Sequence, residues 1–320
     1  MSKKLAPIVV FAFNRPVHLK KTLSALSKNI GAKDSNLYLF VDGPRNSEDR
    51  RTINACIKVG NEFSDNFKTF EVKQSHVNNG LANSIIFGIT HVLQNHPKVI
   101  VVEDDLVTSP YFLDFINRGL ERYQNEKDVA SIHGFVLPFT NPISEPFFMK
   151  GADCWGWGTW SNRWELFNPD GQVLLEELRS KNLIDEFNLD GSYSFSEMLE
   201  NQIAGKNNSW AIRWHASMFL RNKLTLYPAQ TYVENIGFDG SGTHTGETSI
   251  FYSPVSQASQ DLPMEMTVSE EGFKEMSKWY REVYFGKQAR INKSFKIPYL
   301  VYKNFLRRIF RKIFKYVSRQ

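Results

Sequence analysis

Three consecutive acidic residues, Glu103, Asp104 and Asp105, directly follow the apolar run VIVV. Three like charges at the end of a buried strand repel one another unless a cation or a hydroxyl-rich ligand binds them. If the chain is still extended there, Glu103 and Asp105 point to one side and Asp104 to the other, so that one acid can hold a metal while its neighbour reaches a sugar hydroxyl. Carboxylate oxygens suit Mg²⁺ or Mn²⁺, which take further ligands from water and phosphate. The triplet therefore predicts a divalent-cation site, with a solvated acidic turn as the alternative.

The residues up to 135 must position this triplet. They alternate short apolar runs with helical periodicity, a pattern typical of a parallel sheet wrapped by helices. We expect strands at residues 7–13, 37–42, 67–74, 99–104 and 129–135. Ligands of such sheets bind beyond the carboxyl ends of the strands. The polar residues that follow these strands, at 14–15, 42–43, 78–80 and 103–105, are therefore expected to meet in one crevice.

The sequence lacks two common phosphate-binding motifs. No Gly-x-Gly-x-x-Gly follows the first expected strand and no Gly-Lys-Ser/Thr is present, which excludes a dinucleotide fingerprint and a P-loop. A bound diphosphate would therefore be neutralised by a cation, and the acidic triplet is the natural anchor for that cation.

Residues beyond 135 are rich in aromatic residues, proline and glycine, and Trp155, Trp157 and Trp160 lie close together in the sequence. Indole rings stack on the apolar faces of pyranoses, so these tryptophans are expected to form a platform for a sugar acceptor. A buried aromatic core would use the same residue types and is the alternative. The glycines interleaved with the tryptophans favour an exposed loop.

The charge of the chain is unevenly distributed. Residues 287–320 hold eleven Lys and Arg and no acidic residue, whereas residues 1–286 hold 28 basic and 34 acidic residues. Bulky apolar residues interleaved with the basic ones over 298–320 predict a helix on an anionic membrane surface and argue against nucleic acid, the rival partner.

Two further features of the sequence bear on the compartment. Cys56 and Cys154 have neither disulfide nor metal-ligand spacing, and no apolar stretch is long enough to cross a membrane. We therefore expect a cytoplasmic protein that associates peripherally with the inner face of the membrane.

Four segments, APIVVFAFNRPVHLKKTLSAL, LFVDGPR, NNGLANSI and VIVVEDDLVTSPYFL, resemble the nucleotide-sugar half of GT-A glycosyltransferases. The likeness is greatest to enzymes related to family 2 and to N-acetylglucosaminyltransferase I, and it covers roughly residues 5–135. The later segment YPAQTYVENIGFDGSGTHT resembles the loop that closes the active site of the same enzymes. The resemblance implies a GT-A, Rossmann-like fold, a UDP-sugar donor and a Mn²⁺ or Mg²⁺ cofactor, with the acidic triplet in the part of the DxD motif.

Carried over to this sequence, the resemblance implies several site residues. Asp105 would bind the metal, and His244 would either complete the metal shell or be a plain surface residue. Asp104 and Glu103 would contact the ribose and the donor sugar. The residues around the nucleoside base would be Asn14, Arg15, Asp42, Asn79 and Gly80. Most of these residues equally suit a helix start, a turn or a helix cap, so structural roles are the alternative.

The expected catalytic base is not at its usual place. Inverting relatives carry an acid at the start of the helix after the acceptor segment, where this chain reads NNSWAIRW (207–214). An inverting transfer needs a carboxylate that accepts the proton of the acceptor hydroxyl. Either another acid takes this role or the mechanism is not inverting. The candidate bases are Asp153, Glu197 and Asp239.

The sequence thus predicts an α/β protein with a mixed, mostly parallel sheet. Residues 1–135 form the donor half, 136–252 the acceptor and catalytic half, 253–296 a connecting segment with a helix, and 297–320 the basic membrane-associating helix. The predicted activity is transfer of a sugar from a nucleoside diphosphate to a saccharide or lipid-linked saccharide. A sugar-1-phosphate nucleotidyltransferase, whose Gly-rich signature loop is missing here, and a non-catalytic nucleotide- or carbohydrate-binding protein are the alternatives.

Overall fold

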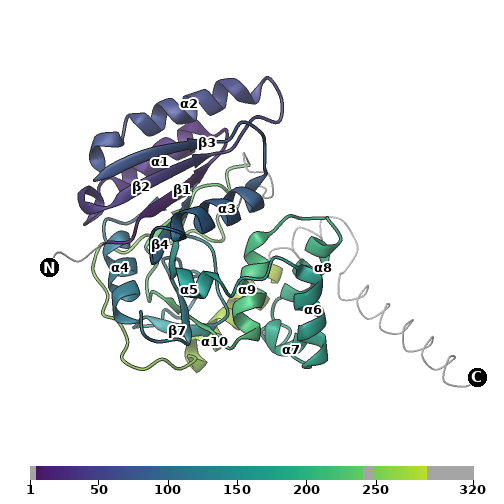
Figure 1. Cartoon of the computed structure of the whole chain (residues 1–320). Coiled ribbons are helices and arrows are strands. Elements are labelled where there is room, and N and C mark those ends of the chain that lie inside the picture. Colours follow the sequence, from purple (N-terminus) through teal and green to yellow (C-terminus); the bar gives the residue numbers. More distant parts are fainter. Residues whose placement is uncertain (1–4, 241–247, 287–320) are drawn as a thin grey trace, which may run out of the picture.

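The computed structural model describes residues 5–240 and 248–286, and its centre is an eight-stranded sheet (Figure 1). The strand order is β3-β2-β1-β4-β8-β6-β9-β7. The strands of this sheet are β1 (Ile8–Ala12), β2 (Asn36–Val41), β3 (Thr69–Gln74), β4 (Lys98–Glu103), β6 (Val129–His133), β7 (Phe147–Lys150), β8 (Trp157–Trp160) and β9 (Leu224–Tyr227). β8 and β7 run antiparallel to their neighbours, and the other six strands are parallel to one another.

A short two-stranded sheet joins distant parts of the chain. Its strands, β5 (Leu106–Thr108) and β10 (Val233–Asn235), pair in antiparallel fashion. β5 follows the acidic triplet directly, so this pairing places the chain around residue 236 beside the triplet.

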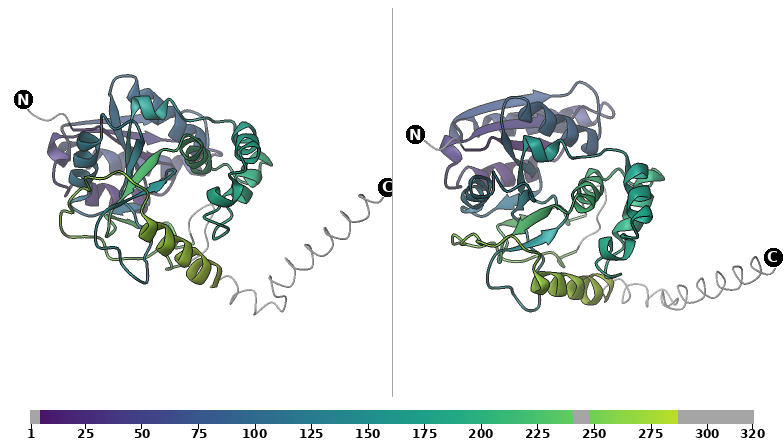
Figure 2. Two further views of the ribbon diagram at one scale, coloured as in Figure 1. Left: turned by 90° about the horizontal axis from the view of Figure 1, so that it is seen from below. Right: turned by 60° about the horizontal axis from the view of Figure 1, so that its bottom comes forward.

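Helices cover both faces of the large sheet (Figures 1 and 2). The α-helices of the described residues are α1 (Pro16–Leu26), α2 (Asp49–Asn61), α3 (Leu81–Leu93), α4 (Phe112–Arg122), α5 (Ser161–Trp164), α6 (Gly171–Ser180), α7 (Ile184–Phe187), α8 (Phe195–Ile203), α9 (Trp210–Leu220) and α10 (Glu270–Trp279). Short 3₁₀ turns lie at Ala32–Asp34 and Ser64–Asn66, and α10 continues into a π-helical turn, η3 (Tyr280–Tyr284). No helix in the described ranges is both long and apolar enough to cross a membrane.

Alternation along the strands divides the core into two faces. Ile8 and Val10 of β1 belong to a cluster with residues of α1, α2 and α4, whereas Val9 and Phe11 pack with residues of α3 and α9. All four side chains are buried because the strand lies between two helical layers. A third cluster joins α6, α7 and α8 to α9, and these helices form the lobe at the right of Figure 1.

The predicted fold class is confirmed, because the sheet is mixed, mostly parallel and flanked by helices. The five predicted strands are present as β1, β2, β3, β4 and β6, with ends within two residues of those expected. The predicted alternation of the acidic triplet is wrong: β4 ends at Glu103, and Asp104 and Asp105 form a turn.

The predicted exposed tryptophan loop is wrong from Trp157 onward. Residues 157–160 form β8, an interior strand between β4 and β6. A Cβ on Gly158 would lie 2.6 Å from a methyl carbon of Ile116, so this glycine permits close packing of α4 on the sheet. The glycine in this tryptophan-rich stretch therefore serves close packing of the interior.

Candidate functional site

The acidic triplet lies at the carboxyl end of β4 and is paired with an arginine from the end of the neighbouring strand. Nη2 of Arg15 contacts the carboxylates of both Asp104 and Asp105, the latter at 2.8 Å. The hydroxyl of Thr22 on α1 donates to the backbone carbonyl of Asp104 at 2.7 Å. Pro16 at the first position of α1 fixes the helix start, which places Arg15 at the sheet edge. The two aspartates therefore point at one guanidinium.

Burial disfavours the charged form of two acids in this cluster. It raises the pKa of Asp104 to about 6 although the Arg15 charge acts in the opposite direction. Burial also raises the pKa of Glu103 to about 8, with further contributions from the charges of Asp105 and Asp104. One guanidinium thus faces three closely spaced carboxyl groups, an arrangement that favours an additional cation or a proton.

The triplet has the chemistry for a divalent cation that completes its shell with other ligands. Among the described residues, no three His, Cys, Asp or Glu side chains gather closely enough to hold an ion alone. A Cβ on Gly237 would lie 2.2 Å from Oδ2 of Asp105, and the backbone N–H of Ile236 donates to the Asp105 carbonyl at 2.8 Å. The glycine therefore leaves room at the Asp105 carboxylate. Mg²⁺ and Mn²⁺ bind in this way, through one or two carboxylates plus water and phosphate.

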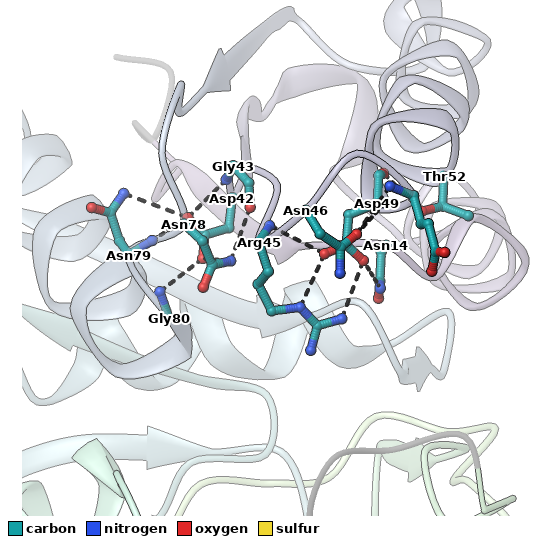
Figure 3. Close-up of polar contacts among 11 residues, drawn as sticks. Asn14, Asp42, Gly43, Arg45, Asn46, Asp49, Thr52, Asn78, Asn79 and Gly80 are labelled. Carbon is teal, nitrogen blue, oxygen red and sulfur yellow. Dashed lines mark hydrogen bonds and ion pairs between the residues drawn. The ribbon is translucent and has the colours of Figure 1, made fainter.

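Asp42, after β2, fastens the neighbouring loop to the sheet edge (Figure 3). Its carboxylate accepts the backbone N–H groups of Gly43, Asn79 and Gly80, each at 2.9 Å, and the side-chain amide of Asn78 at 3.1 Å. A Cβ on Gly43 would lie 2.4 Å from the backbone of Val77, so glycine is needed for this close approach. In this structure Asp42 is therefore a positioning residue that fixes the loop before α3.

A second ion pair at the same edge involves residues to which the sequence analysis gave no role (Figure 3). Nε of Arg45 lies 3.0 Å from a carboxylate oxygen of Asp49, and the amide of Asn14 donates to that carboxylate at 2.9 Å. The hydrogen bonds from Arg45 and Asn14 lower the pKa of Asp49 against the effect of burial. The Arg45 guanidinium lies 4.7 Å from the centre of the Phe13 ring. Arg45 comes shortly after β2 in the segment LFVDGPR, and this position in the sequence could have identified it as a residue of the sheet edge.

An aromatic cavity of about 630 Å³ lies in the other half of the molecule. We call it the Asp153 cavity, because Asp153 is the one carboxylate among the described residues that line it. Nine aromatic rings line it: Phe135, Trp155, Tyr193, Phe195, Tyr227, Phe238, Phe251, Tyr280 and Tyr284. Cys154 also lines the cavity. Burial raises the pKa of its thiol, and the charges of Asp153, Glu103 and Asp105 contribute to this shift.

The structure separates the three candidate bases. Asp153 lines the cavity, and its Oδ1 accepts the backbone N–H of Cys154 at 2.8 Å. Glu197 lies on α8 and is exposed, and Asp239 lies 3.0 Å from Nε2 of His18. Asp153 is therefore the candidate that lines a cavity, whereas Asp239 follows the segment that contacts Asp105.

The three predicted platform tryptophans also have different surroundings. The ring of Trp155 lines the cavity, with its centre 4.7 Å from that of Phe135. Trp157 is fully buried and stacks on Trp210, and Trp160 is buried with its Nε1 donating to the carbonyl of Leu120. Trp155 is thus the one whose ring a cavity ligand would meet. His244, the second predicted metal ligand, lies outside the described residues.

Comparisons with known proteins leave the family of this chain open. No protein-family model and no curated protein matches it. Its structure is similar to that of TarS from S. aureus, with 10% identity and a TM-score of 0.33 over 46% of this chain and 25% of TarS.

Two other solved structures show likeness of the same order. Glucosyl-3-phosphoglycerate synthase from Mycobacterium tuberculosis has 11% identity and a TM-score of 0.33, over 56% of this chain and 66% of that enzyme. A putative glucose-1-phosphate thymidylyltransferase from Bacillus anthracis has 12% identity and a TM-score of 0.30, over 51% of this chain and 74% of that protein. Similarity at this level assigns no activity to this chain.

Proposed function

We propose that this protein is a glycosyltransferase that moves a sugar from a nucleoside diphosphate, with a UDP-sugar as the expected donor, to a saccharide acceptor. The observation that carries the proposal is the convergence of the acidic triplet, Arg15 and the loop held by Asp42 at the carboxyl ends of neighbouring parallel strands. Ligands bind at this edge in open α/β sheets. The sequence resemblance over residues 5–135 supports the same reading.

The donor would lie along this edge. Asn14, Asn79 and Gly80 would surround the nucleoside base, and Glu103 and Asp104 would contact the ribose and the donor sugar. Asp105 would hold the cation, which when bound neutralises the departing diphosphate. Arg15 lies beside the triplet and adds a fixed positive charge close to the same phosphates.

Asp153 would act as the base on the acceptor side. Its carboxylate accepts the proton of the acceptor hydroxyl while the acceptor oxygen forms a bond to the anomeric carbon. The bond from that carbon to the diphosphate oxygen breaks, and its electron pair leaves with the diphosphate. This displacement inverts the anomeric configuration.

Thermal unfolding in the presence of nucleotides tests the donor site. We expect UDP or a UDP-sugar to raise the melting temperature when Mn²⁺ is present, because a ligand that binds the folded state alone stabilises it. ADP and GDP with Mn²⁺, and UDP without metal, are the controls. A melting temperature that no nucleotide changes would contradict the proposal.

We further propose that the acceptor belongs to a lipid-linked or surface polysaccharide and that residues 298–320, outside the described part of the chain, bind the anionic membrane surface. The basis is the sequence alone, in which bulky apolar and basic residues alternate. Deleting 298–320 is expected to abolish binding to vesicles that contain phosphatidylglycerol and to leave nucleotide binding unchanged. Full retention on the vesicles would refute this membrane role.

A further inference from the structure

We infer that the Asp153 cavity binds an uncharged pyranose of the acceptor and discriminates against anionic sugars. We also infer that α10 and η3 form one wall of that site. The inference rests on the proposed function for the identity of the bound group as an acceptor. It goes further by naming the class of sugar and by assigning a binding role to residues beyond 252.

The first support is the way in which the cavity is built. Met276, Tyr280 and Tyr284 of α10 and η3 line it together with residues before 252, and the ring centres of Tyr193 and Tyr280 lie 4.4 Å apart. α10 also packs against β7 at the far edge of the sheet, and Figure 2 shows it along the bottom of the molecule in the right-hand view. Without α10 and η3 the cavity would lose one wall. The segment 253–286 is therefore part of the site as well as a connection.

The second support is the nature of the lining. Ring faces pack favourably against the C–H faces of a pyranose, and tyrosine hydroxyl groups can orient the sugar hydroxyls. Burial, with the Asp153 charge adding to it, raises the pKa values of Tyr193, Tyr227 and Tyr280, so these hydroxyls remain neutral at physiological pH. The volume of about 630 Å³ lies within the usual size of a small-molecule site.

The third support is the charge of the lining. Lys150 is the one Lys or Arg among the described lining residues, and its Nζ is already held 2.8 Å from Glu186 and 4.1 Å from the centre of the Phe219 ring. Asp153 contributes the one carboxylate among the described lining residues. A phosphate or carboxylate on the sugar would therefore be repelled and would find no unengaged cation among these residues.

Saturation-transfer NMR on the full chain, with UDP and the diamagnetic cation Mg²⁺ present, tests this inference. The probes are methyl β-D-glucopyranoside and methyl N-acetyl-β-D-glucosaminide, compared with glucuronic acid and glucose 6-phosphate. We expect saturation of the neutral glycosides and little of the anionic sugars. Trp155→Ala is expected to weaken neutral glycoside binding roughly tenfold, as loss of a central aromatic contact does.

Three further variants test whether the glycoside binds in the cavity and whether α10 and η3 contribute to it. Ala211→Phe, on the cavity wall, fills the space without removing a packed side chain and is expected to abolish glycoside binding even if Trp155→Ala unfolds. Phe87→Ala removes a ring that is 64% exposed on α3, outside the cavity, and is expected to leave binding unchanged. Tyr280→Ala tests the α10 and η3 wall and should weaken binding severalfold.

The possible results separate the two proposals. Anionic sugars that bind as well as neutral ones, glycoside binding that Ala211→Phe leaves intact, or no glycoside binding to a protein that UDP stabilises would each overturn the cavity inference and leave the donor site standing. Neutral glycosides that bind with no response to any nucleotide would support the cavity as a carbohydrate site and refute the transferase.

Discussion

The polar cluster at the carboxyl ends of β1, β2 and β4, called the crevice below, and the Asp153 cavity differ in the groups that line them. In the crevice, charged side chains pair with one another, as Arg15 does with Asp104 and Asp105 and as Arg45 does with Asp49. In the cavity, aromatic rings surround one carboxylate. The crevice is suited to a charged nucleotide whose position the parallel sheet determines, and the cavity to an uncharged group whose shape the rings determine. The two sites should therefore respond independently to mutation.

The largest expected effect comes from Asp153→Asn, which removes the proposed base and keeps the shape of the cavity. Transfer to a neutral glycoside, measured as release of UDP from the donor, should fall about 10²- to 10⁴-fold, the usual contribution of a general base. The UDP-induced shift in melting temperature should not change. Asp128→Asn, at an exposed carboxylate outside both sites, is the control. A greater loss in Glu197→Gln or Asp239→Asn would move the role of the base to that residue.

Asp105→Ala should act on the crevice alone. We expect the Kd for UDP in the presence of Mn²⁺ to rise about 10- to 100-fold, because the cation would lose a direct ligand. Neutral glycoside binding should be unchanged. Titration calorimetry with and without Mn²⁺ measures both, and Asp128→Ala provides the matched control. An unchanged Mn²⁺-dependent affinity would remove Asp105 from the metal site.

Arg15→Ala tests the charge balance of the same edge. Loss of the guanidinium leaves two carboxylates without their countercharge, and we expect the free energy of unfolding to fall by about 1–3 kcal/mol, less than for a fully buried pair because Arg15 is partly exposed. Mn²⁺ should restore part of this loss. Urea unfolding with and without Mn²⁺ measures it, and Arg179→Ala, which breaks an exposed pair with Glu200, should cost less. Equal losses in the two variants would show that the Arg15 cluster is an ordinary surface pair.

The crevice was largely predictable from sequence, whereas the cavity was not. Apolar runs that end in polar residues mark the strands, and parallel strands bring their carboxyl ends to one edge. The contact of Arg15 with the triplet follows from the adjacency of β1 and β4, which the sequence does not state but a doubly wound sheet would suggest. The Asp153 cavity draws on segments from Phe135 to Tyr284, and no local pattern reveals that they meet.

The tryptophan-rich segment shows why local patterns fail in this region. Glycine beside tryptophan is compatible with a mobile loop and with a tightly packed interior strand, and the choice depends on Ile116, which is distant in sequence. The aromatic residues in YREVYF (280–285) indicate that this segment packs against other apolar residues. Their partners could not be inferred, because Tyr193 lies in a different segment with no periodic pattern.

The smallest expected effect is the contribution of two histidines in the cavity half to the pH dependence of stability. His133 is buried and His215 is half-buried on the wall of the Asp153 cavity, and desolvation lowers the pKa of each, which favours the neutral ring in the folded protein. Nε2 of His133 accepts the backbone N–H of Trp155 at 3.0 Å, a bond that requires the neutral ring. At these two positions the unfolded chain takes up protons below about pH 6.5 more readily than the folded protein does, so the stability that they contribute is lost as the pH falls below that value.

In urea unfolding at pH 7.5 and pH 5.5, each histidine should therefore contribute a loss of at most about 1.4 kcal/mol. Glu103 and Asp104 act in the opposite direction, because their raised pKa values let the folded protein take up protons in the same pH range. Whatever the stability of His215→Gln at pH 7.5, this variant should lack the contribution of one histidine to the difference in unfolding free energy between the two pH values. His76→Gln, at an exposed histidine next to the crevice, should not change that difference. Equal pH dependence in all three proteins would mean that the titration lies elsewhere.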